Sequence, residues 1–152
     1  MKFNPLAALP AALAILLLGP ATPVLASGEG LAVLMERMQT YTHKAQLSVE
    51  ARNAPLADFY LHELEETAEH IVEHVESYDD YPVGALTREM LLPAIEALED
   101  ALEEGDWAET GHRFSALLQS CNDCHVATGH GLIRIVPAAG NPFAQDFAPR
   151  AD

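Results

Sequence analysis

The sequence predicts an all-α protein in which four helices form an antiparallel bundle, followed by a non-helical C-terminal extension. Four stretches place apolar residues at helical spacing, and no run alternates apolar and polar residues long enough to predict a sheet. The connections between these stretches are short, which favours antiparallel neighbours that each bury one apolar face. A chain of 152 residues is long enough for one such domain and short for two.

Residues 1–26 have the pattern of a secretory signal peptide. Lys2 supplies the positive start, Leu6–Leu18 is apolar, and Ala26 is the small residue expected before a cleavage point at Ser27. The alternative is an uncleaved membrane anchor, but the apolar stretch is short for a bilayer span and contains a proline. We therefore expect an exported, periplasmic protein with no membrane segment after cleavage.

The bundle is expected over residues 27–131, and its first two helices are separated by a short turn. The first is predicted from Leu31 to about Arg52, with an apolar face made of Leu31, Leu34, Met38, Tyr41, Ala45 and Ser48. Asn53 is the expected N-cap of the second, with Pro55 in the first turn, where its missing N–H costs nothing. The apolar stripe of this second helix is predicted to be Leu56, Phe59, Tyr60, Leu64, Ala68, Ile71 and Val75. The segment 78–82 should end it.

The third and fourth helices are expected to be joined at Gly105. The third is predicted over about 82–104, and Pro93 inside it should kink it or split it in two. Its apolar face is Leu86, Met90, Leu91, Ile95, Leu98 and Leu102. Asp106 begins the fourth, which is expected to reach His125 or a little beyond.

The last part of the chain, residues 132–152 (the tail), has a different character. It is rich in proline, glycine and phenylalanine and shows no helical period. It also carries several large apolar residues, namely Ile133, Ile135, Val136, Phe143 and Phe147. We therefore expect the tail to pack on the bundle.

The charge balance excludes some classes of partner. The chain has 8 Lys and Arg against 23 Asp and Glu, a formal net charge of −15. A chain this acidic cannot neutralise a run of phosphates, which argues against nucleic-acid binding, and it lacks a polybasic membrane-binding segment. A positively charged partner protein would be favoured.

One motif carries specific chemistry. Residues 121–125 read Cys-Asn-Asp-Cys-His, which is the C-x-x-C-H attachment sequence of a c-type haem, and these are the only two cysteines. The thiols of Cys121 and Cys124 can form thioethers to one porphyrin, and the imidazole of His125 can bind its iron. A thioredoxin-like redox pair would need a βαβ pattern, and a zinc site would need further ligands. We therefore expect one covalently bound haem c.

With this motif on the last of four predicted helices of an exported precursor, the chain resembles the class II c-type cytochromes, the cytochrome c′ and c556 group. The resemblance covers residues 31–130 and implies a four-helix bundle, a redox partner protein and a capacity to form homodimers. The chain departs from that family in its long tail and in the Asn122-Asp123 pair between the cysteines.

A second axial ligand would have to come from an early helix. All four methionines precede the motif, and His130 is too close to His125 to reach the opposite side of the ring. In an antiparallel bundle the start of the first helix lies beside the end of the fourth, which favours Met38. Met35, His74 or no ligand at all are the alternatives, and in the resembling family an apolar residue can leave the iron five-coordinate.

The other histidines suggest weaker hypotheses. His70 and His74 are four positions apart and could chelate a transition metal, although an exposed acidic helix face explains them as well. A second metal site could be formed by three histidines at a similar level of the bundle, or these could simply be hydrogen-bonding residues: His43, His62 and His112. Arg134 is a candidate partner for a haem propionate.

These observations predict a mono-haem electron carrier. A vacant position on the iron would instead predict a protein that binds nitric oxide or carbon monoxide. An enzyme such as a peroxidase is the third hypothesis. We do not expect one, because no histidine is clearly placed for acid–base catalysis over the iron.

Overall fold

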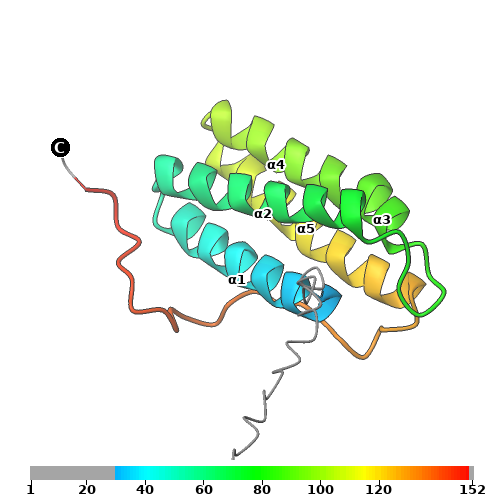
Figure 1. The fold of residues 1–152 in the computed structure, drawn as a ribbon. Coiled ribbons are helices and arrows are strands. Elements are labelled where there is room, and N and C mark those ends of the chain that lie inside the picture. The colour runs from blue at the N-terminus through cyan, green and yellow to red at the C-terminus, as the bar shows by residue number, and fades with distance from the viewer. Residues whose placement is uncertain (1–29, 151–152) are drawn as a thin grey trace, which may run out of the picture.

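The structure is a computed structural model that describes residues 30–150; the predicted signal peptide lies outside these residues. The described chain is mostly helical, which confirms the all-α prediction (Figure 1). Between residues 30 and 150 there is no strand, only an isolated bridge between Tyr78 and Tyr81. The helical elements are α1 (Leu31–Glu50), α2 (Ala54–His74), α3 (Val83–Leu86), the π-helical turn η1 (Thr87–Leu91), α4 (Leu92–Glu103) and α5 (Trp107–Ala127).

The turn between α1 and α2 reverses the chain over three residues. Arg52 takes a left-handed backbone conformation, with φ of 56°. Asn53 caps α2, and its side-chain oxygen accepts a hydrogen bond from the backbone N–H of Leu56 at 3.4 Å. Pro55 lies in the first turn, as the sequence predicts. The two helices therefore run antiparallel and side by side (Figure 1).

The predicted third helix is split, and the split lies beside Pro93 as expected. Pro93 is in the first turn of α4, directly after η1. Proline has no N–H to donate and its ring clashes with the carbonyl group four residues earlier. A π-helical turn accommodates this misfit by widening the backbone for one turn.

α5 begins at a well-defined cap. Gly105 has a φ of 72°, and the side chain of Asp106 accepts hydrogen bonds from the N–H groups of Ala108 and Glu109 at 3.0 and 3.1 Å. The helix ends at Ala127, so the predicted extension beyond His125 is confirmed.

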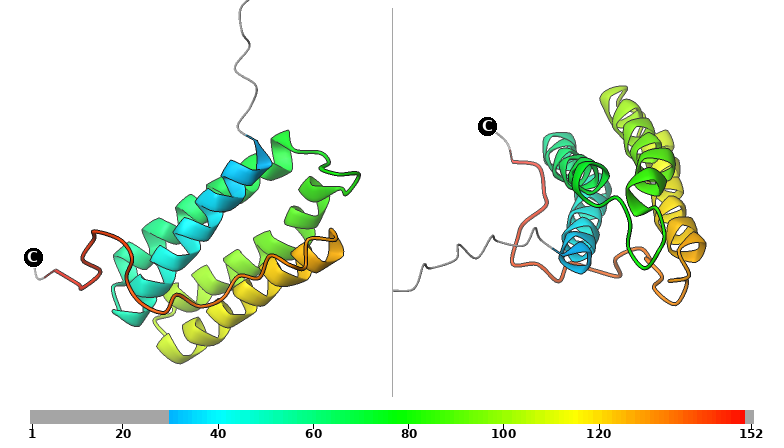
Figure 2. Two further views of the ribbon diagram at one scale, coloured as in Figure 1. Left: turned by 90° about the horizontal axis from the view of Figure 1, so that it is seen from below. Right: turned by 45° about the vertical axis from the view of Figure 1, so that its right-hand side comes forward.

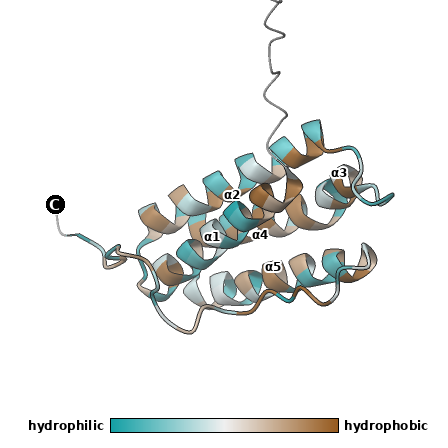
Figure 3. Ribbon diagram, turned by 60° about the horizontal axis from the view of Figure 1, so that its bottom comes forward, coloured by the Kyte–Doolittle hydropathy of each residue, from teal (hydrophilic) through white to brown (hydrophobic). Residues whose placement is uncertain are grey.

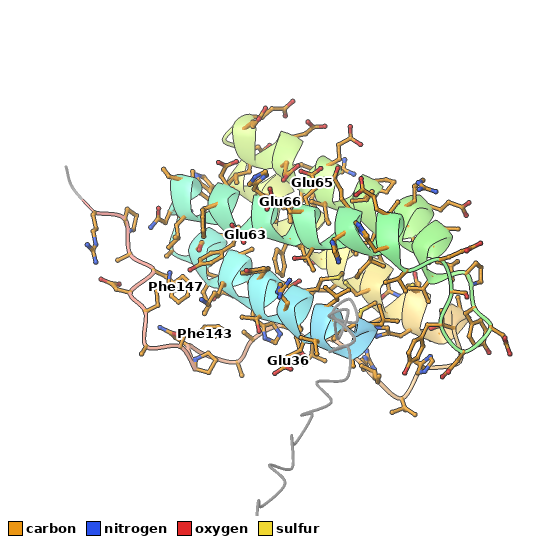
Figure 4. The ribbon with its side chains drawn as sticks, in the orientation of Figure 1. Glu36, Glu63, Glu65, Glu66, Phe143 and Phe147 are labelled. Atoms are coloured by element: carbon orange, nitrogen blue, oxygen red, sulfur yellow. The ribbon has the colours of Figure 1, made fainter. Side chains whose placement is uncertain are left out.

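The helices form two pairs, α1 with α2 and α4 with α5, which pack on each other through α2·α4 and α1·α5 (Figure 2). Apolar faces turn toward the space between the pairs (Figure 3). The largest fully buried apolar side chains are Leu34, Leu61, Leu64, Ile71, Ile95, Leu98 and Leu117. The prediction was wrong for Phe59, which is 51% exposed, whereas Ala57 and Leu61 are buried. The stripe on α2 is centred nearer Leu61, which turns Phe59 toward solvent.

The tail runs back from the end of α5 along α5 itself and then crosses α1 toward the α1–α2 turn (Figure 2). Side chains of the helices hold it through Gln46 with Ala138, Tyr60 with Gln145 and Asn53 with Phe147. Phe147 is buried, and the ammonium group of Lys44 lies 5.1 Å from the ring centre of Tyr60 and 5.2 Å from that of Phe143. None of the helices in the described range is long and apolar enough to cross a membrane.

Acidic side chains meet where α2 faces α4. Burial, followed by the nearby charges of Glu65 and Asp58, raises the pKa of Glu99 from 4.5 to about 7, while His62 opposes this shift. An unfolded chain would release this proton near pH 4.5, so between pH 4.5 and 7 the folded state binds more protons than the unfolded state. The free energy of unfolding should therefore fall as the pH rises through this interval.

Glu99→Gln removes this ionisation. We expect the variant to be more stable than the wild type at about pH 8, by on the order of 1 kcal/mol after allowance for solvent screening, and little changed at about pH 5. Urea unfolding at the two pH values measures the difference. The control is Glu96→Gln, an exposed glutamate on the same helix. Equal stabilisation at both pH values would contradict the assignment.

Candidate cofactor site

A cavity of about 340 Å³ lies between the start of α1 and the end of α5. Side chains from α1, α3, η1, α5 and the tail line it, and most of this lining is apolar. The cavity is within the size range of small-molecule and cofactor sites. The sequence-based expectation that the first turns of the first helix lie beside the last turns of the fourth is confirmed by these shared walls.

Cys121, Cys124 and His125 all line this cavity from α5. Residues three and four positions apart share one face of a helix, so the C-x-x-C-H spacing delivers all three side chains to the same wall. Both cysteines are free thiols and partly buried. Burial, with a smaller contribution from Cys124, raises the pKa of Cys121 to about 11, and burial also raises the pKa of Cys124. Both therefore carry their protons at neutral pH, which makes them poor redox nucleophiles.

The imidazole of His125 is held by the tail. Its Nδ1 atom lies 3.0 Å from the backbone carbonyl oxygen of Ile133. A carbonyl oxygen only accepts, so Nδ1 must carry the proton, and a neutral ring then leaves Nε2 with a free electron pair. Histidines that bind metals commonly donate their other ring N–H in this way.

Two methionines of α1 form part of the facing wall. Met38 is only 6% exposed and Met35 is partly buried, and both line the cavity. The backbone carbonyl of Met38 accepts a hydrogen bond from the hydroxyl of Thr42 at 2.8 Å, and Thr42 also lines the cavity. The cavity thus combines two thiols, the imidazoles of His125 and His130 and two thioethers with apolar walls, a set that suits a large, mainly apolar iron-containing group.

His74 is not part of this site, and its candidacy as an axial ligand is wrong. Its side chain is exposed on the last turn of α2, and its Nδ1 lies 3.1 Å from the carbonyl oxygen of His70. The rings of His70 and His74 stack with their centres 4.2 Å apart. Chelation by this pair alone stays a prediction.

The second metal site predicted from three histidines is also wrong. His43 contacts the carbonyl oxygen of Val136 at 3.2 Å, and the other two pair along their own helices, His62 with Glu66 and His112 with Glu109. Over the range 30–150 no three His, Cys, Asp or Glu side chains are arranged to hold a metal ion. A shared level along the bundle, which is what the sequence suggested, does not determine the direction in which a helical side chain points.

The sequence reasoning missed some wall residues. His130 and Tyr78 line the cavity, and His130 Nε2 lies 3.8 Å from a carboxylate oxygen of Asp79. Asp79 belongs to the turn between α2 and α3, so this turn and the segment after α5 both contribute to the cavity wall. Arg134 is exposed and does not line the cavity, so the structure gives no support to its role toward a propionate.

Comparison with known proteins identifies no relative of this chain. No family model, no curated protein and no solved structure matches the chain. The resemblance to class II c-type cytochromes therefore rests on the residues themselves, above all on Cys121, Cys124 and His125.

Gly84 determines how α3 approaches the rest of the site. A Cβ atom at this position would lie 2.7 Å from the carbonyl oxygen of Val75, at the end of α2. Only a glycine allows this approach, which places Val83 and Thr87 on the cavity wall.

We expect Gly84→Ala to destabilise the fold by about 1–3 kcal/mol, because the backbone of α2 has to move. The matched control is Gly111→Ala on α5, where nothing lies within 4 Å of the added Cβ. This control should be more stable than the wild type by about 0.5–1 kcal/mol. Denaturant unfolding compares the two, and similar effects of both variants would refute the close-approach argument.

Proposed function

We propose that this chain is an exported mono-haem c-type cytochrome that carries electrons in the periplasm. The observation that supports the proposal best is that Cys121, Cys124, His125 and Met38 line one apolar cavity. Nothing in the C-x-x-C-H motif itself requires such a cavity beside it. A thiol pair with only a structural or redox role would not need one.

In this proposal the two helix pairs are the antiparallel four-helix bundle of the class II c-type cytochromes, with residues 30–131 as the described part of the bundle. The packing of α1 on α5 supports it, because that contact brings the start of the bundle to the haem motif. The tail is the main departure from the family, since it is held first by α5, then by α1 and finally by residues at the start of α2.

The chain's own groups fit the binding of haem c. Cys121 and Cys124 would hold the group through thioether bonds, and His125 would bind the iron through Nε2. When bound, the haem would supply a one-electron redox couple. The apolar walls would exclude water from the site, and the net charge of −15 would favour the more positive oxidised state and lower the reduction potential.

Met38 is the proposed sixth ligand, and a five-coordinate protein that binds nitric oxide or carbon monoxide is the second candidate. Met38 favours electron transfer, because it is buried on the wall that α1 contributes. The second candidate is supported by the apolar lining of the cavity, because small diatomic ligands enter apolar sites readily. A redox partner with a basic surface would suit the acidic chain.

Expression of the full chain with a c-type haem maturation system tests the proposal. We expect a haem that stays on the denatured chain, at one iron per chain, in the exported fraction. The paired variant Cys121→Ser with Cys124→Ser should release the haem under the same conditions. A wild-type chain without covalent haem would refute the proposed function.

Spectra of the oxidised, reduced and CO-treated reduced protein test the sixth ligand. We expect Met38→Ala to shift the absorption bands and to allow CO binding, because a thioether ligand is lost. The controls are Met35→Ala in the same cavity and Met90→Ala outside it. A wild type that already binds CO, with an unchanged spectrum in Met38→Ala, would favour the five-coordinate candidate.

A further inference from the structure

Asn122 fastens the tail to α5. Its side-chain amide donates to the carbonyl oxygen of Ile135 at 2.9 Å and accepts from the N–H of the same residue at 2.7 Å. The amide therefore satisfies both backbone groups of Ile135, as a neighbouring strand would. Asn122 is also the residue that follows the first cysteine of the motif.

The same stretch of tail contacts His125. Ile133 lies two residues before Ile135, and its carbonyl oxygen faces Nδ1 of His125 at 3.0 Å. Asn122 and His125 are three positions apart on α5, so they share a helix face. The side chains of Ile133 and Ile135 line the cavity. One short segment thus covers the cavity, bonds to Asn122 and holds the imidazole.

We propose that residues 132–136, the strap, position the iron-binding imidazole, and that Asn122 is the positioning residue that holds the strap in register. This inference rests on the proposed function and deepens it. The double hydrogen bond fixes Ile135, and the chain direction then places the carbonyl of Ile133 opposite Nδ1. The ring keeps one orientation and one tautomer, which is the condition for Nε2 to bind iron.

The hydrogen bond also affects the redox equilibrium. An Nδ1–H that donates to a carbonyl makes the imidazole a stronger electron donor, which stabilises the oxidised state of a bound iron. Loss of the strap should weaken this donation and raise the reduction potential. His43 still contacts Val136 at the end of the strap and Gln46 still binds Ala138 beyond it, so the loss of the Asn122 hydrogen bonds is local.

Asn122→Ala removes both hydrogen bonds, and Asn122→Leu removes them while keeping a side chain of similar size. The control is Gln119→Ala, which deletes an exposed hydrogen bond to Asp123 on the same helix without a tail contact. Two quantities are measured: the reduction potential of the haem-loaded chain, and the exchange rate of the His125 Nδ1 proton by nitrogen-15 NMR in the haem-free full chain.

We expect both Asn122 variants to shift the one-electron equilibrium toward the reduced form by about threefold to tenfold, the upper value being ~59 mV. Proton exchange at Nδ1 should accelerate about tenfold or more once the carbonyl is free to move. Gln119→Ala should change neither quantity. An unchanged potential and unchanged exchange in both Asn122 variants, with haem attached, would overturn the strap while leaving the proposed function intact.

The exchange rate of the His125 Nδ1 proton distinguishes a failure of the proposed function from a failure of the strap. If the wild type attaches no haem, the proposed function fails, but faster Nδ1 exchange in the Asn122 variants would still support the strap. If Asn122→Ala fails to fold, the exchange rate in Asn122→Leu tests the strap by itself. Slow exchange in that variant would refute the inference.

Discussion

The last turns of α5 present two thiols and an imidazole on one face, and most of the structure around the site serves to cover that face. α1 covers it with Met35 and Met38, and α3 and η1 cover it with Val83 and Thr87. The tail adds Ile133 and Ile135 to the lining of the same cavity. Three features are consistent with the need to cover this face of α5: the antiparallel turn at Asn53, the split of the third predicted helix before Pro93, and the path of the tail.

The parts of the fold that sequence reasoning predicted well are those governed by local rules. The caps at Asn53 and Asp106 follow from side chains that satisfy free N–H groups, and the split at Pro93 follows from a missing donor. The direction in which each side chain points from its helix was harder to predict. Phe59 was misplaced because an error of one position on a helix turns a side chain by about 100°, and the three distant histidines were grouped by level without regard to direction. The pairing of α1 with α5 at Met38 was predictable, since it depends on topology rather than on direction.

The tail shows the limit of that reasoning most clearly. Its apolar residues predict that it packs, but they do not say on which surface. Its anchors are side-chain amides that bind backbone groups, as Asn122 does at Ile135 and Gln46 at Ala138. Any residue but proline offers such backbone groups, so the partner leaves no trace in the sequence. Asn122 looked like an unusual feature of the motif, and only the structure gives it a partner.

The site also places a cost on the fold that a bound group would offset. A partly open apolar cavity forgoes the close packing that stabilises a protein interior, and here it is also lined by two thiols and two imidazoles. A group that binds only the folded chain would add its binding free energy to the stability of the fold. The strap then has two consequences at once, because the segment that orients His125 also lines the cavity.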